Sequence, residues 1–234
     1  MKEIFRTVVG SRLYNLHSET SDTDIKGFAL PSAEDLLGMS DTARQHWEQP
    51  NDTVIYSVTK FFSLLAKGNP TVIELLFVPD EAVLVSTVEA REILAFARKT
   101  FVTKAILPAY FGYVSDQFKR VESRKAQNNR TTMIEEHGYD LKCSSHVYRL
   151  AVQAVELMTT GVCHPRMSGT DRQVALDMKR GKYTYEQTMD ILTIAFSGMK
   201  AAESKCKLPE SPDMGLVNDY VVALHRRVIL ADSI

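Results

Sequence analysis

The sequence predicts an α+β fold, in which a small mixed sheet is followed by a helical C-terminal region. Short apolar runs bounded by polar residues predict strands at 4–9, 24–30 and 52–58. After residue 80 the apolar residues recur instead with the period of amphipathic helices. We therefore expect an α/β core over residues 1–80 and a helical domain over residues 81–234.

Two further elements complete the expected core. A short helix is predicted at 11–16, between the first two strands, and a polar, irregular stretch should extend to residue 51. The third strand runs into an amphipathic helix that contains Phe61, Phe62 and Leu65 and ends at Gly68. The polar residues of this region are thus placed at the ends of neighbouring strands.

Cap chemistry predicts where several helices of the second region begin. Ser86 and Glu89 have the spacing of a capping box, in which each side chain accepts a hydrogen bond from the other residue's backbone. Thr184 and Gln187 repeat that spacing before another apolar-periodic run. A last helix is expected after Ser211-Pro212.

Composition limits the classes of function that the chain can have. With 234 residues, of which 44% are hydrophobic, it can bury a substantial core. A formal net charge of −1 excludes a bulk electrostatic grip on nucleic acid, so any polynucleotide would need a local basic patch. The odd number of cysteines and the lack of an apolar N-terminal segment predict a reduced, cytoplasmic setting without a membrane.

The segment GSRLYNLHSETSDTD at residues 10–24 carries the strongest chemical signal. If Asp22 and Asp24 lie on a strand, their carboxylates point to one face and can hold a divalent cation. Upstream, Gly10 permits close approach of the backbone to a ligand, and Ser11 offers a hydroxyl to phosphate oxygens. This pairing of phosphate and metal ligands suits nucleotidyl transfer from a nucleoside triphosphate (NTP) with Mg²⁺ (or Mn²⁺).

Two other interpretations of this segment were weighed. Asp-Thr-Asp after a serine also occurs as a polar turn, because Asp and Ser bond to their own backbone. An EF-hand loop is excluded, since Lys26 and Ala33 occupy positions where that loop requires carboxylate or amide ligands.

These residues resemble the signature of the polymerase-beta superfamily of nucleotidyltransferases. Three further stretches, at 60–77, 138–150 and 178–187, resemble the RNA-repair-associated predicted nucleotidyltransferases of bacteria and phages. The resemblance covers most of the chain in the same order. It implies transfer of NMP from an NTP to an acceptor, with release of pyrophosphate, in a bacterial or phage-infected cell.

A third carboxylate is expected beside the aspartate pair. Asp52 begins the third strand of the same sheet and is our choice, so Asp22, Asp24 and Asp52 form the predicted catalytic and metal-binding set. Glu74 is the competitor, but it falls in a segment that reads as helix and is expected on the helix surface.

A basic stripe is predicted on a helix that starts near residue 140. Lys142, His146, Arg149 and Gln153 recur at spacings of four, three and four, which places them on one face. Such a stripe is commonly a solvated face, but the resemblance favours phosphate binding by Lys142, His146 and Arg149.

The acceptor is the least determined part of this prediction. A basic stretch over 117–130 favours RNA, either tRNA or a single-stranded end, with a protein as second choice. A nucleotide- or RNA-binding regulator without turnover, or an antitoxin-like enzyme that modifies protein, stays open. A zinc site formed by Cys143, His146, Cys163 and His164 is disfavoured, because adjacent residues do not easily reach one tetrahedral ion.

Overall fold

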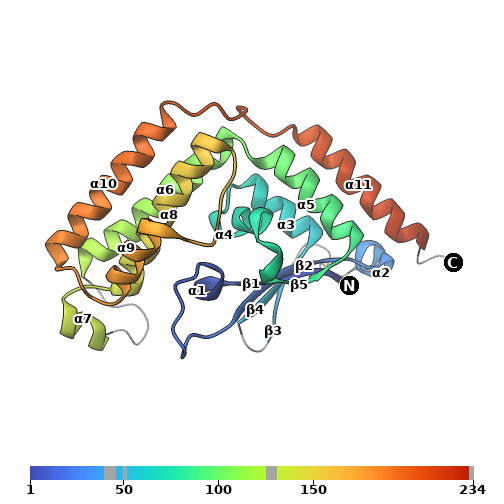
Figure 1. Cartoon of the computed structure of the whole chain (residues 1–234). Coiled ribbons are helices and arrows are strands. Elements are labelled where there is room, and N and C mark those ends of the chain that lie inside the picture. Colours follow the sequence, from blue (N-terminus) through green and yellow to red (C-terminus); the bar gives the residue numbers. More distant parts are fainter. Residues whose placement is uncertain (40–45, 50–51, 125–130, 232–234) are drawn as a thin grey trace. The chain divides into compact units, whose positions relative to one another are not determined.

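A computed structural model describes residues 1–39, 46–49, 52–124 and 131–231 (Figure 1). The chain forms two compact units, residues 1–106 with 209–234, and residues 107–208. The strands are β1 (Lys2–Val9), β2 (Asp24–Leu30), β3 (His46–Gln49), β4 (Thr53–Ser57) and β5 (Val83–Ser86). The helices are α1 (Gly10–Leu13), α2 (Ala33–Leu37), α3 (Val58–Ala66), α4 (Pro70–Ile73), α5 (Val88–Phe101), α6 (Leu107–Ser123), α7 (Thr131–His137), α8 (Leu141–Thr160), α9 (Gly169–Lys179), α10 (Tyr185–Glu203) and α11 (Met214–Ala231), with 3₁₀ turns η2 (Glu74–Phe77), η3 (Asp80–Ala82) and η4 (Lys104–Ile106).

The first unit is built on one mixed sheet with strand order β3-β4-β2-β1-β5. β1 is antiparallel to β2 and β5, β3 is antiparallel to β4, and β2 and β4 are parallel. The parallel pair brings the starts of β2 and β4 to the same end of the sheet, since Ile25 lies opposite Thr53. The predicted α+β fold, with a small mixed sheet and helices concentrated after it, is confirmed.

Aromatic stacking joins this sheet to the helix that covers it. Phe28 of β2 stacks on Phe5 of β1 and on Phe61 of α3, with ring centroids 5.1 and 4.6 Å apart. All three side chains are buried, and Figure 1 shows α3 and α5 on the same side of the sheet. The core therefore lies between the sheet and these helices, and the strand ends that carry the polar residues lie at its margin.

Sequence reasoning placed some boundaries incorrectly. The units do not divide at residue 80, because β5 pairs with β1 and α11 packs on α2, so both elements belong to the first unit. The polar stretch before residue 51 contains α2 and β3, although residues 40–45 and 50–51 lie outside the described part. The last helix starts at Met214, beyond the Ser-Pro pair expected to open it.

The cap predictions had different outcomes. Thr184 and Gln187 form the expected capping box at the start of α10. Ser86 instead ends β5, and Thr87 caps α5 by accepting a hydrogen bond from the Ala90 amide. The prediction was wrong by one residue, because the strand pairing extends to Ser86.

The second unit is a helical unit organised around α8. This helix packs against α6, α9 and α10, and its buried residues include Val147, Leu150 and Ala154. Asp140 caps its first turn, as the predicted start near residue 140 requires. Among the described helices, none is long and apolar enough to cross a membrane.

Candidate functional site

A cavity of about 410 Å³ lies at the end of the sheet where β2 and β4 begin. Asp24 is the first residue of β2, and Asp52 directly precedes β4. The Ile25 amide donates a hydrogen bond to the Asp52 carbonyl oxygen at 3.2 Å, so the backbone fixes the two residues side by side. The polar and glycine residues that line this cavity are Gly10, Tyr14, Asp24, Lys26, Asp52, Thr53 and Glu74.

The electrostatics of the cavity centre on Asp24. Burial raises the pKa of its carboxyl above the usual value, and the negative charges of Asp52 and Asp22 raise it further. Lys26 opposes this shift. Two neighbouring carboxylates thus act on Asp24, and a carboxylate among like charges is a favourable ligand for a cation.

The position of the Asp24 carboxylate requires a glycine at residue 10. Its φ of +66° is left-handed, and a Cβ added to it would lie 1.8 Å from Asp24 Oδ2. The backbone at the end of β1 therefore approaches the carboxylate more closely than any other residue type would allow.

Asp22 is not on the strand where the alternation argument placed it. β2 begins at Asp24, and Asp22 lies in the exposed loop before it. Arg12 holds this loop, because its guanidinium donates to the Ser21 and Asp22 carbonyl oxygens at 2.8 and 3.3 Å. Asp22 still acts on Asp24 through its charge, but within the described residues neither Asp22 nor Ser11 lines the cavity.

Glu74 is buried, so its expected position on a helix surface was wrong. The side chain is 3% exposed, lines the cavity, and accepts hydrogen bonds from the Tyr14 hydroxyl at 2.9 and 3.0 Å. Two features accompany this burial: α4 starts at Pro70 and tightens into a 3₁₀ turn at Glu74, and the donor Tyr14 comes from a distant part of the sequence. Sequence reasoning also missed Tyr14 and Lys26, which no motif distinguished.

The residue chemistry suits an ion shared with a substrate more than a closed metal cage. Among the described residues, no three His, Cys, Asp or Glu side chains are arranged to hold one metal ion. Magnesium, however, is commonly bound by one or two carboxylates with substrate phosphates supplying further oxygens. The metal-binding roles of Asp22, Asp24 and Asp52 stay predictions.

Three of the four residues expected to form a basic stripe on α8 form a polar network, which is buried at Arg149 and Gln153. Arg149 is 1% exposed and donates to Gln153 Oε1 at 2.5 Å, and its other terminal nitrogen lies 3.0 Å from His146 Nδ1. His146 Nε2 lies in turn 3.2 Å from the Tyr113 hydroxyl. Only Lys142 of the expected set is exposed, and phosphate binding by Lys142, His146 and Arg149 stays a prediction.

The basic stretch that favoured RNA is described in part. Lys119 and Arg120 are exposed at the end of α6. Arg124 stacks over the Tyr185 ring, with the guanidinium carbon 3.7 Å from the ring centroid. Lys125 and Arg130 lie outside the described residues.

The chain resembles known proteins both by family and by an individual relative. Residues 1–210 match the model of the RNA repair pathway DNA polymerase beta family, RlaP. The chain is also 29% identical, over 128 residues, to an uncharacterized 38.9 kDa protein from the nrdC-mobD intergenic region of Enterobacteria phage T4. That alignment covers 50% of this chain and 38% of the phage protein, so the chain matches well under half the length of this relative.

Proposed function

The chain belongs to the RNA repair pathway DNA polymerase beta family, and on this premise we propose that it is a metal-dependent nucleotidyltransferase. Membership itself supports a nucleotidyltransferase-like role. The finer proposal is that the enzyme transfers NMP from an NTP to an acceptor, with an RNA end as the preferred acceptor, and releases pyrophosphate.

One observation supports the catalytic part of this proposal above all others. Asp24 and Asp52 line one cavity, and the pKa of Asp24 is raised by burial and by the charges of Asp52 and Asp22. Such an arrangement costs stability unless something positive compensates it, and perturbed carboxyls in a cavity are typical of functional sites. A cation bound with a triphosphate would supply that compensation.

The proposed roles follow from where each side chain lies. Asp24, at the start of β2, and Asp52, directly before β4, would hold Mg²⁺ or Mn²⁺, with Asp22 contributing from the loop. When bound, the ions neutralise the triphosphate and lower the pKa of the acceptor hydroxyl. Gly10 lets the Asp24 carboxylate lie against the end of β1. Ser11, which lies outside the cavity lining, keeps its predicted role of offering a hydroxyl to a phosphate.

Glu74 is a second candidate for the third carboxylate. It lines the same cavity as Asp52, but it is buried and held by Tyr14, whereas Asp52 is exposed. An exposed carboxylate can approach a metal ion that arrives from solvent without breaking a buried hydrogen bond. For that reason we keep Asp52 as the proposed third ligand.

The decisive experiment is NMP transfer with radiolabelled NTPs and Mg²⁺, using tRNA, single-stranded RNA and protein as acceptors. Asp24→Asn should lower transfer by about 10³-fold, because the neutral amide is a poor magnesium ligand. Asp52→Asn and Glu74→Gln, measured in parallel, assign the third carboxylate by which of the two losses is larger.

The matched control is Asp80→Asn, which removes an exposed carboxylate of the same unit outside the cavity. It should leave transfer unchanged. Undiminished transfer by Asp24→Asn would refute the proposed mechanism. Manganese-dependent nucleotide binding without transfer to any acceptor class would instead indicate a regulator that binds nucleotide without turnover.

A further inference from the structure

A second cavity, of about 330 Å³, lies wholly within the helical unit. It is formed by the C-terminal half of α8, the segment 161–168 that follows it, and the first turn of α9. The proposed chemistry at the sheet uses none of its residues. Its lining nevertheless holds a histidine, an arginine, two carboxylates and several apolar side chains.

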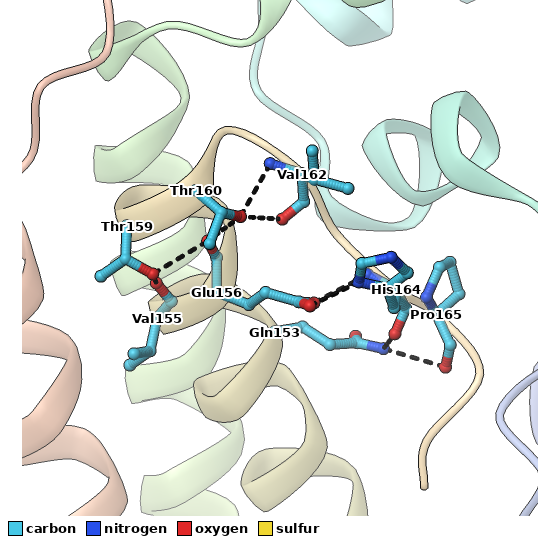
Figure 2. Close-up of polar contacts among 8 residues, drawn as sticks. All are labelled: Gln153, Val155, Glu156, Thr159, Thr160, Val162, His164 and Pro165. Atoms are coloured by element: carbon cyan, nitrogen blue, oxygen red, sulfur yellow. Dashed lines mark hydrogen bonds and ion pairs between the residues drawn. The ribbon is translucent and has the colours of Figure 1, made fainter.

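The histidine of this cavity is held in a fixed orientation. One carboxylate oxygen of Glu156 accepts from the backbone amide of His164 at 2.7 Å, and the other lies 2.5 Å from Nδ1 of the same residue (Figure 2). Because Glu156 occupies Nδ1, Nε2 and the ring face are what a ligand can meet. Glu156 thus fixes the orientation of the imidazole, which is still 72% exposed to solvent.

A buried network holds the backbone of the same segment. Gln153, one turn before Glu156 on α8, donates to the Pro165 carbonyl at 3.1 Å (Figure 2). Arg149 donates in turn to Gln153 Oε1, and both side chains are buried. The helix therefore fixes this wall from two consecutive turns, which lowers the entropy lost when a ligand binds.

The charges that line the cavity are mixed and nearly balanced. Arg166 and His164 line the cavity together with the carboxylate residues Glu156 and Asp171. An isolated phosphate would lie near two carboxylates, and a metal ion would lie near an arginine. A neutral, planar ligand with both hydrogen-bond donors and acceptors suits this lining better.

The apolar part of the lining supports the same kind of ligand. Val152, Val155 and Met167 present apolar surface, which a flat aromatic ring covers well. Histidine rings and guanidinium planes are surfaces on which unstacked RNA bases are held, with hydrogen bonds at the base edge. Asp171, which accepts from the Tyr148 hydroxyl at 2.7 Å, is an acceptor available for that edge.

We infer that this cavity binds an unstacked nucleobase of an RNA strand. His164 supplies the stacking surface, Arg166 and Asp171 contact the base edge, and Glu156 positions the imidazole. The inference deepens the proposed function, since it names single-stranded RNA as the acceptor class. It does not depend on transfer activity, because the cavity is built from residues of the second unit alone.

The test is the affinity of the full chain for a fluorescein-labelled single-stranded oligoribonucleotide, measured by anisotropy without NTP or Mg²⁺. His164→Ala should weaken binding about tenfold, as is typical when one stacking side chain is lost. Glu156→Ala should weaken it about threefold, because the ring remains but is no longer held. His137→Ala is the control, a partly exposed histidine of the same unit that does not line the cavity.

Two further arms identify what is bound. A ribose-phosphate strand of the same length without bases should bind wild type and His164→Ala equally, and a loss that persists with this strand would show a phosphate contact and overturn the inference. Competition by AMP as effective as that by the oligomer would assign the cavity to free nucleotides instead of RNA. Equal RNA affinity of folded wild type and His164→Ala, with folding checked by circular dichroism, also overturns it.

Because these measurements contain no NTP, their outcome is separate from that of the transfer assay. An enzyme that binds RNA through His164 but transfers nothing would retain this inference and lose the proposed function. If the enzyme transfers NMP but His164→Ala binds RNA as tightly as wild type, the proposed function is retained and this inference is lost.

Discussion

The two units use their polar side chains in opposite ways. In the first unit, Asp24, Asp52 and Asp22 place like charges close enough to raise the pKa of Asp24, and burial adds to the shift. In the second unit, polar groups of complementary kind are joined in a buried chain that runs from Arg149 through Gln153 to the segment after α8. In the first cluster Lys26 offsets the like charges only in part, because the pKa of Asp24 is still raised. In the second cluster the polar groups satisfy one another.

This difference separates groups that stabilise the fold from groups that destabilise it in the absence of a ligand. Buried polar groups that satisfy one another fix a structure, and removing one member leaves the others without partners. Like charges collected around a cavity lower stability and are retained where a ligand repays the cost. Substitutions in the two clusters should therefore have effects of opposite sign on stability.

After the loss of transfer expected for Asp24→Asn, the next largest effect on activity is expected at Gly10. Gly10→Ala adds a Cβ that would lie 1.8 Å from Asp24 Oδ2, and the carboxylate, as the flexible partner, must move away. We expect NMP transfer to fall about 10²-fold, because a displaced ligand no longer holds its cation. Steady-state transfer with saturating Mg²⁺ measures this loss.

Gly138→Ala separates the displacement from backbone strain. Gly138 also has a positive φ, of +80°, but a Cβ there meets nothing within 4 Å. Both variants should lose stability by about 1 kcal/mol in urea unfolding, the cost of a left-handed alanine. Equal transfer by the two variants would show that close approach of Gly10 to Asp24 has no catalytic importance.

The next largest effect is expected from breaking the buried network of the second unit. Arg149→Met keeps the length of the side chain but leaves Gln153 Oε1 without its guanidinium donor. Removing one partner from a buried network that includes a charge costs about 3 kcal/mol, which urea unfolding of the variant would measure. Lys142→Met, at an exposed position of the same helix, should change stability by less than about 0.5 kcal/mol. Similar small changes in both variants would mean that the network does not stabilise this unit.

The comparison also shows what a sequence can reveal about each cluster. The carboxylates were found because short motifs keep them near strand starts, and the parallel pairing of β2 and β4 then brings Asp52 beside Asp24. Asp22 was placed on a strand because the alternation rule was applied two residues before pairing begins. The apolar runs made it predictable that these segments are strands, but the residue at which pairing begins depends on the neighbouring strand.

Residues whose position depends on distant parts of the chain were not predictable. Glu74 is buried because a 3₁₀ turn follows α4 and because Tyr14, sixty residues earlier, donates to it. Arg149 reads as part of an exposed stripe, since its spacing says which residues share a face but not what covers that face. The return of α11 to the first unit likewise depends on packing that no local pattern encodes.

A smaller effect is expected at Tyr14 and Glu74, a satisfied hydrogen-bonded pair that lines the same cavity of the first unit as Asp24. Tyr14→Phe removes the hydroxyl that donates to both oxygens of the buried carboxylate, which should cost about 1–2 kcal/mol in urea unfolding. A double-mutant cycle with Glu74→Gln isolates the pair, and we expect a coupling energy of about 1 kcal/mol. A coupling energy near zero would mean that Glu74 does not depend on Tyr14.

The smallest effect is expected on the thermal stability of Asp24→Asn. Its sign shows whether the Asp24 carboxylate stabilises or destabilises the fold. The folded-state pKa of Asp24 lies above its ordinary value of 3.8, because of burial and the charges of Asp52 and Asp22. The folded protein therefore binds this proton more tightly than the unfolded chain does, and stability falls as pH rises through the raised pKa. At neutral pH the ionised Asp24 lowers stability, so its replacement by asparagine should raise Tm by about 1–2 °C. Near pH 4 this advantage should shrink, since the wild-type carboxyl then carries its proton for part of the time.

Added Mn²⁺ and a non-hydrolysable NTP should reverse the order of the two Tm values at neutral pH, because ligand binding stabilises only a protein that can hold the ion. A lower Tm for Asp24→Asn at neutral pH without ligand would show that this carboxylate stabilises the fold, and the contrast between the two units would then fail.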